Sequence, residues 1–150
     1  MKKAIIIILI FTLLITTTSC AKKDNTQHLI EEYLKQTKLV EKFYYVEYTA
    51  SVVINDSVGD EWSFAIICEN GNDTEIEGLV YTDEETPIFT LCAREKDNIS
   101  DYGYLEIEFS DLNIGQSEEI TQFVVVTENC GRYSGNQAII EFIVTCTRFK

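Results

Sequence analysis

The feature that most constrains the fold of this chain is a two-residue alternation of apolar and polar side chains, which begins after Phe43. In residues 44–54 and again in residues 138–146, every second side chain is apolar or aromatic. This period puts successive side chains on opposite faces of a strand, one for a core and one for solvent. The same reading predicts strands at residues 44–54, 62–68, 74–82, 87–94, 102–109, 120–128 and 138–148. Short, closely spaced strands and a single proline predict an all-β fold, an antiparallel β-sandwich of about seven to eight strands over residues 43–150.

One helix is predicted ahead of these strands. From Thr26 to Lys42 the apolar residues recur every three or four positions, which is the spacing of one helix face. Glu31 lies four residues before Lys35, a spacing that stabilises helices. We therefore expect residues 20–42 to hold a short tether and one N-terminal amphipathic helix.

The first twenty residues have the three-part layout of an export signal. Two lysines precede an apolar run that ends at Ile15, and small or hydroxylated residues then lead to Cys20. The apolar run is shorter than the roughly 20 residues that a membrane-spanning helix needs.

The segment resembles the lipobox of bacterial lipoproteins. The resemblance implies that residues 1–19 are a signal peptide, that Cys20 is lipidated, and that the protein is anchored in the cell envelope at the outer membrane or cell surface. An ordinary cleaved signal and an uncleaved anchor are the alternatives.

The charge balance excludes some classes of partner. The chain has 25 acidic and 12 basic residues, for a net charge of −13, and removing the signal makes it two units more negative. Nucleic acids and anionic lipids are bound through Lys and Arg surfaces, so neither is an expected partner of the folded domain. An acid-rich exported domain is either simply soluble or built to hold cations. The membrane, through the lipid on Cys20, and an unidentified protein or glycan are the expected partners.

Four cysteines follow Cys20, an even number that in an exported protein predicts two disulfides. Strand alternation puts Cys68 and Cys146 on apolar faces, whereas Cys92 faces outward and Cys130 lies in a loop. The pairs Cys68–Cys146 and Cys92–Cys130 are compatible with this placement, but the spacing does not decide among the three possible pairings. Buried free thiols are the alternative.

Two acidic segments, residues 55–61 and 95–103, lie between predicted strands. Ca²⁺ is bound by six to eight oxygen ligands, and carboxylates in several loops of a rigid sandwich can supply them. Neither segment has the twelve-residue pattern of a helix–loop–helix calcium site. Counting strand directions along the seven predicted strands puts the two segments at opposite ends of the sandwich, unless one connection breaks the alternation. Solvated surface loops are the alternative reading.

The run from Ile88 to Leu112, IFTLCAREKDNISDYGYLEIEFSDL, resembles the calcium- and phospholipid-binding sandwich domain of protein kinase C and synaptotagmin. The resemblance implies Ca²⁺ as a ligand. The positions that it assigns to the metal site are Glu95, Asp97 and Asp101 in this run, with Asn55, Asp56 and Asp60 in the partner loop.

The residues give little support to an enzyme. The only histidine, His28, precedes the predicted sandwich. The sandwich therefore has no histidine of its own to act as a base for a serine or cysteine nucleophile. The alternation predicts that Glu106 and Glu108 face solvent, which argues against a carboxylate-dependent hydrolase. The loop 129–137 carries Arg132 and Tyr133, residue types favoured at recognition surfaces, although its glycines are also ordinary turn residues.

Overall fold

The chain divides into two compact units, Met1–Leu39 and Val40–Lys150. The computed structural model describes residues 25–35, 42–82, 84, 86–97 and 99–150. In the first unit, residues 25–35 form an α-helix, which confirms the predicted N-terminal helix. Residues 36–41 of the predicted helix lie outside the described residues, as does Cys20, and Lys42 already begins the first strand. No helix in the described parts of the chain is long and apolar enough to cross a membrane.

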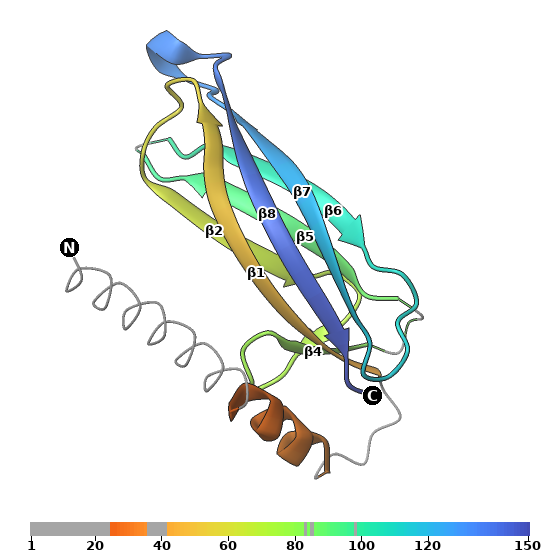
Figure 1. Ribbon diagram of the computed structural model, residues 1–150. Helices are drawn as coiled ribbons and strands as arrows, with labels where there is room; N and C mark the ends of the chain where they lie inside the picture. The colour runs from red at the N-terminus through yellow and green to blue at the C-terminus, as the bar shows by residue number, and fades with distance from the viewer. Residues whose placement is uncertain (1–24, 36–41, 83, 85, 98) are drawn as a thin grey trace, which may run out of the picture. The chain divides into compact units, whose positions relative to one another are not determined.

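The second unit is a sandwich of two antiparallel sheets (Figure 1). Its elements are β1 (Lys42–Asn55), β2 (Trp62–Cys68), β3 (Asn72–Asp73), β4 (Leu79–Thr82), β5 (Ile88–Glu95), β6 (Tyr102–Glu108), β7 (Ser117–Thr127), the short 3₁₀ helix η1 (Gly131–Tyr133) and β8 (Gln137–Arg148). One sheet has the strand order β3-β4-β1-β8-β7, and the other has the order β2-β5-β6. The predicted all-β sandwich of seven to eight strands is confirmed.

The alternation in the sequence becomes an alternation in burial. In β5, Phe89, Leu91 and Ala93 are at most 1 % exposed, and the residues between them are partly or fully exposed. The inward side chains of β8, all fully buried, are Ala138, Ile140, Phe142, Val144 and Cys146. The rings of Phe64 and Phe142 meet edge to face, 5.9 Å apart, across the two sheets. Each such aromatic side chain contributes a large buried apolar area, so the core between the sheets is the main source of stability.

The strand predicted at residues 74–82 is wrong, because the chain reverses within that stretch. β3 and β4 pair antiparallel as a small hairpin. Backbone hydrogen bonds from Thr74 N to Leu79 O and from Leu79 N to Ile76 O, both 3.0 Å long, close its turn. Gly78 provides the positive φ of 80° that the turn requires. The hairpin therefore adds one reversal of direction that counting seven strands leaves out.

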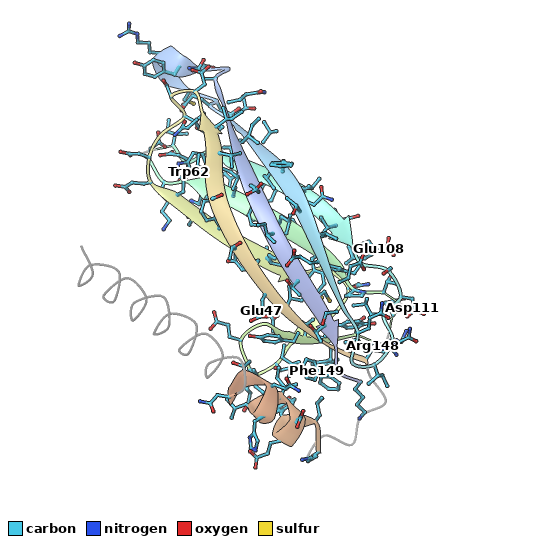
Figure 2. All side chains as sticks on the ribbon, in the orientation of Figure 1. Glu47, Trp62, Glu108, Asp111, Arg148 and Phe149 are labelled. Atoms are coloured by element: carbon cyan, nitrogen blue, oxygen red, sulfur yellow. The ribbon has the colours of Figure 1, made fainter. Side chains whose placement is uncertain are left out.

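The extra reversal determines which loops share an end of the sandwich (Figure 1). We call the end with loops 56–61, 96–101 and 128–136 the apical end, and the end where β1 begins and β8 finishes the basal end. Figure 2 shows Trp62 toward the apical end, and Arg148 and Asp111 near the basal end. At the basal end, Arg148 forms a salt bridge of 3.4 Å with Asp111.

Candidate functional site

Both acidic segments lie at the apical end, so the expectation that they would lie at opposite ends is wrong. The added reversal in the β3–β4 hairpin is the reason. Lys96 N donates a hydrogen bond of 2.6 Å to Glu61 O, which joins the loops 56–61 and 96–101 directly. The loop 128–136 joins them, because Asn129 donates hydrogen bonds to Asp101. Three loops that are far apart in the sequence thus form one surface.

Beneath these loops, carboxylates occupy the last inward-facing positions of both sheets. Glu95 follows the buried residues of β5 in the same alternation and is 2 % exposed. Asp101 lies opposite it and is 1 % exposed, and Glu95 N donates a 3.0 Å hydrogen bond to Asp101 O. In the other sheet the inward residues Val124 and Val126 are followed by Glu128, which is 9 % exposed. The apical end of the core is therefore closed by three buried acidic residues.

Two of the buried carboxylate oxygens have no hydrogen-bond partner. Asp101 Oδ1 accepts hydrogen bonds from Asn129 N (3.1 Å) and Asn129 Nδ2 (2.8 Å), and Glu128 Oε1 accepts one from Cys130 N (3.3 Å). By contrast, Glu95 Oε2 and Asp101 Oδ2 are buried and unpaired in the part of the chain that the structure describes. Buried polar atoms are normally hydrogen-bonded, and leaving a charged one unpaired is costly. These two oxygens therefore need a partner from outside the described chain or a proton.

The electrostatic environment of Glu95 is uniformly negative. Burial raises the pKa of Glu95 above its usual range, and the charges of neighbouring carboxylates raise it further. In decreasing order of effect, these neighbours are Asp97, Asp101, Glu128 and Asp60. No basic side chain is among the groups that shift the pKa of Glu95. Like charges around a buried carboxyl favour either its protonation or the binding of a cation.

The first loop lies against Glu95 because residue 59 is a glycine. A Cβ at Gly59 would collide with the Glu95 carboxylate, and the φ of 141° at Gly59 is one that other residues rarely adopt. The buried Val58 anchors the same loop in the core, and Val58 N donates a 2.9 Å hydrogen bond to Asn55 Oδ1. Local backbone geometry thus places Asp60 beside the buried carboxylates.

The structure brings together four of the six residues that sequence reasoning assigned to a metal site. Asp60 and Asp97 are exposed and lie close enough to raise the pKa of Glu95. Asp97 Oδ1 accepts a 2.8 Å hydrogen bond from Ile99 N. Asn55 is occupied in shaping its own loop, since its amide nitrogen donates to Gly59 O and its amide oxygen accepts from the backbone. Asp56 is exposed, and its backbone N donates to Gln137 O.

Sequence reasoning missed Glu128 and Asn129. The signal for Glu128 was present, because the inward alternation of Val124 and Val126 continues to residue 128. Asn129 had no comparable signal, since its contact with Asp101 joins loops 28 residues apart.

Hard oxygen donors of this kind suit Ca²⁺ or Mg²⁺ rather than metals that prefer nitrogen or sulfur. Within the described residues no group of three or more His, Cys, Asp or Glu side chains is already arranged to hold a metal ion. An ion at Glu95 and Asp101 would therefore have to draw in carboxylates from the surrounding loops. The three loops give it Asp60, Asp97 and Glu128 to draw on.

The other candidate recognition residues lie on the outer part of the loop 128–136. Arg132 and Tyr133 belong to η1, and the Arg132 guanidinium carbon is 5.8 Å from the centre of the Tyr133 ring. No residue of η1 is buried. This pair is therefore available to a partner.

The four described cysteines are free thiols, and the two disulfides stay a prediction. Burial, followed by the nearby Glu118 and Cys68, raises the pKa of Cys146 to about 12, so this thiol is protonated at neutral pH. Cys68 packs against the core and Cys92 lies on the outward face of β5, as the alternation predicts. Cys130 is exposed in the apical loop.

Glu106 and Glu108 are exposed on the outward face of β6, as predicted, and Glu108 accepts a 2.6 Å hydrogen bond from Thr86. His28 is exposed in the N-terminal helix. None of these three residues forms part of the apical group of acids.

No family model matches the chain, and no curated protein or solved structure is similar enough to count as a match.

The raised pKa of Glu95 predicts a specific dependence of stability on pH in the absence of divalent cations. A carboxyl whose pKa is higher in the folded state binds more protons there, so the free energy of unfolding falls as pH rises from the usual glutamate value of 4.5 through the raised one. Glu95→Gln removes this loss. Urea denaturation in EDTA should show the difference in unfolding free energy, Glu95→Gln minus wild type, increasing between pH 4.5 and 8. The exposed Glu108→Gln is the matched control, with a difference that stays flat. Parallel curves for wild type and Glu95→Gln would contradict the assignment.

Proposed function

We propose that the protein is a lipid-anchored protein of the cell envelope whose β-sandwich is a non-enzymatic binding module, stabilised by Ca²⁺ at its apical end. The observation that carries the calcium part is the pair of buried, unpartnered oxygens, Glu95 Oε2 and Asp101 Oδ2. A divalent cation would satisfy both oxygens and offset the repulsion among the carboxylates around them. No other part of the described chain combines buried acids with missing partners in this way.

The choice of Ca²⁺ over Mg²⁺ follows from the flexibility of the site. Mg²⁺ demands a near-ideal octahedron and releases its water reluctantly, whereas Ca²⁺ accepts six to eight oxygens in irregular geometry. The ligands come from several loops, and Asp60 and Asp97 are exposed, so the site is irregular and partly open to water. Sites in extracellular modules commonly bind Ca²⁺ with Kd values of about 10⁻⁴–10⁻³ M, which suits a protein outside the cell.

The position of the apical end favours a role in recognition. The chain enters the sandwich at Lys42, at the basal end, and β1 then runs 14 residues toward the apical loops. At ~3.3 Å per residue the apical loops lie about 45 Å from the point of entry. The apical loops thus lie at the end of the sandwich opposite Lys42, where the chain from the lipid on Cys20 enters, so the entering chain does not cover them.

A metal-free protein-interaction or inhibitor module is the second candidate. The exposed Arg132–Tyr133 pair favours it, because Arg and Tyr are enriched at binding hot spots. In this candidate Glu95, whose pKa is raised by burial and by the neighbouring carboxylates, carries a proton and no cation binds beside it. A carboxylate-dependent hydrolase has no support from Glu106 and Glu108, which point away from the core.

Direct calcium titration tests the proposal. In isothermal titration calorimetry of the full chain in detergent, we expect one Ca²⁺ to bind with a Kd of roughly 10⁻⁵–10⁻³ M. Asp101→Asn keeps an oxygen for Asn129 but removes the charge, and it should weaken binding at least ~10-fold, a loss of about 1.4 kcal/mol. Asp97→Asn should weaken it in the same direction. Asp111→Asn at the basal end is the matched control and should leave the Kd unchanged. Absence of binding at several millimolar Ca²⁺, with a wild-type fold, would favour the metal-free module.

The lipid anchor has its own test in an expressing bacterium. The full chain should be found in the membrane fraction and should incorporate labelled palmitate, because two or more acyl chains give stable membrane attachment. Cys20→Ala should abolish the label and move the protein out of the membrane fraction. Cys130→Ala changes an exposed thiol elsewhere and should leave both readouts unchanged. Retention of Cys20→Ala in the membrane would indicate an uncleaved anchor instead.

A further inference from the structure

The acidic residues of the candidate cation site also hold the base of the loop 128–136. Asp101 Oδ1 accepts both hydrogen bonds from Asn129, and Asp101 Oδ2 is the unpartnered oxygen in the core. Glu128 Oε1 accepts the hydrogen bond from Cys130 N. The same two buried carboxylates therefore close the apical end of the core and fix the first residues of the loop.

The rest of the loop has little else to order it. All side chains from Asn129 to Gly135 are exposed, so apolar packing does not hold them. Its remaining backbone hydrogen bonds are Glu128 N to Asn136 O (2.9 Å), Gly135 N to Glu128 O (2.8 Å) and Asn136 N to Tyr133 O (2.9 Å). Two of these three bonds are made by the backbone of Glu128, and the Ser134 hydroxyl donates one further bond of 3.4 Å to Asn129 O. A segment with few buried contacts opens readily, so its order is sensitive to its polar anchors.

The charges of these carboxylates determine whether a cation stabilises or destabilises the base of the loop. Without a cation, the three acidic side chains buried at the apical end of the core, Glu95, Asp101 and Glu128, repel one another when ionised. This repulsion works against the two carboxylates that carry the loop. A bound divalent ion reverses the sign of the interaction, because each carboxylate is then attracted to the ion between them.

We infer that the cation and the loop 128–136 form one composite site, in which Glu128 is a further ligand and occupancy orders the loop that presents Arg132 and Tyr133. The recognition surface is then formed fully only in the cation-bound protein. This inference rests on the proposed calcium site, and it adds that partner binding through this loop is controlled by calcium. Asp101 is the shared group, with one oxygen for the ion and one for Asn129.

Hydrogen–deuterium exchange of the full chain in detergent tests the coupling. Exchange of peptides covering residues 128–136 is compared in EDTA, in millimolar Ca²⁺ and in the same concentration of Mg²⁺. We expect Ca²⁺ to slow exchange of the Asn129 and Cys130 amides at least ~10-fold, since amides bonded to charged groups gain most from a fixed partner. The basal loop 109–116 is the internal control and should exchange at the same rate in all three conditions.

Two variants test separately whether Glu128 is a ligand of the ion and whether ion binding is coupled to the order of the loop. Glu128→Gln keeps an acceptor for Cys130 and should weaken Ca²⁺ binding at least ~10-fold by calorimetry. Glu119→Gln, on the outward face of the same strand, should leave it unchanged. Asn129→Ala removes one of the two hydrogen bonds to Asp101 but no carboxylate. It should keep the wild-type Kd within about 3-fold while reducing the calcium-dependent protection of the loop to roughly 3-fold or less.

The outcomes distinguish the inference from the proposal on which it rests. Calcium binding by calorimetry with unchanged exchange in the loop would overturn the coupling and leave the calcium site standing. Full protection in Asn129→Ala, or unchanged binding in Glu128→Gln, would also overturn it. If the protein binds no calcium at all, both the coupling and the calcium site are overturned.

Discussion

The burial of two acidic side chains, Glu95 and Asp101, is the constraint on which the apical end of this sandwich depends. They occupy inward-facing positions, opposite each other where β5 ends and just before β6 begins, where a sandwich normally places apolar side chains. Like charges directly across a strand pair are destabilising, and burial strengthens the effect because the interior screens charge poorly. Apolar residues at both positions would close the core at lower cost. A cation between them, as proposed above, would turn the same geometry from destabilising to stabilising.

The small β3–β4 hairpin is what allows this arrangement. Without its added reversal, the loop 96–101 would lie at the basal end, far from the loop 56–61. With it, β1, β5 and β7 all run toward the apical end, so three loops meet over the buried acids. The hairpin itself is short and lies beside the start of β1 at the basal end. A minor local element thus decides which functional residues come together.

Periodicity alone predicts most of the fold. It predicts six of the long strands within a few residues, the inward placement of Cys146 and the outward placement of Glu106 and Glu108. It fails at residues 74–82 because a turn stabilised by Gly78 interrupts a stretch with enough apolar residues to pass for one strand. That single error reverses the predicted direction of every later strand. The prediction therefore places the two acidic segments at opposite ends of the sandwich, although they lie at the same end.

The candidate site was predictable only in part. Glu95, Asp97, Asp101 and Asp60 stand out as acids in loop-like segments, but their burial depends on the contact between loops. Glu128 ends an alternating strand, and a charged residue at a strand end is ordinarily taken for a solvated one. No pattern in the sequence identifies Asn129 as a site residue, because its role is a hydrogen bond to a residue in another hairpin. Long-range register, rather than local composition, makes these residues a site.

The most direct test of the account is a thermal melt of the wild-type chain and Glu95→Gln, each in EDTA and then in excess Ca²⁺. A ligand that binds only the folded state at a hundredfold excess over its Kd adds ~2.7 kcal/mol of stability, a shift of roughly 8 °C for a domain of this size. We expect that shift in the wild type. In Glu95→Gln we expect a higher melting temperature than the wild type in EDTA, because a buried unpaired charge is gone, and little or no shift with Ca²⁺. Equal responses of the two proteins to Ca²⁺, or a lower melting temperature of Glu95→Gln in EDTA, would contradict the account.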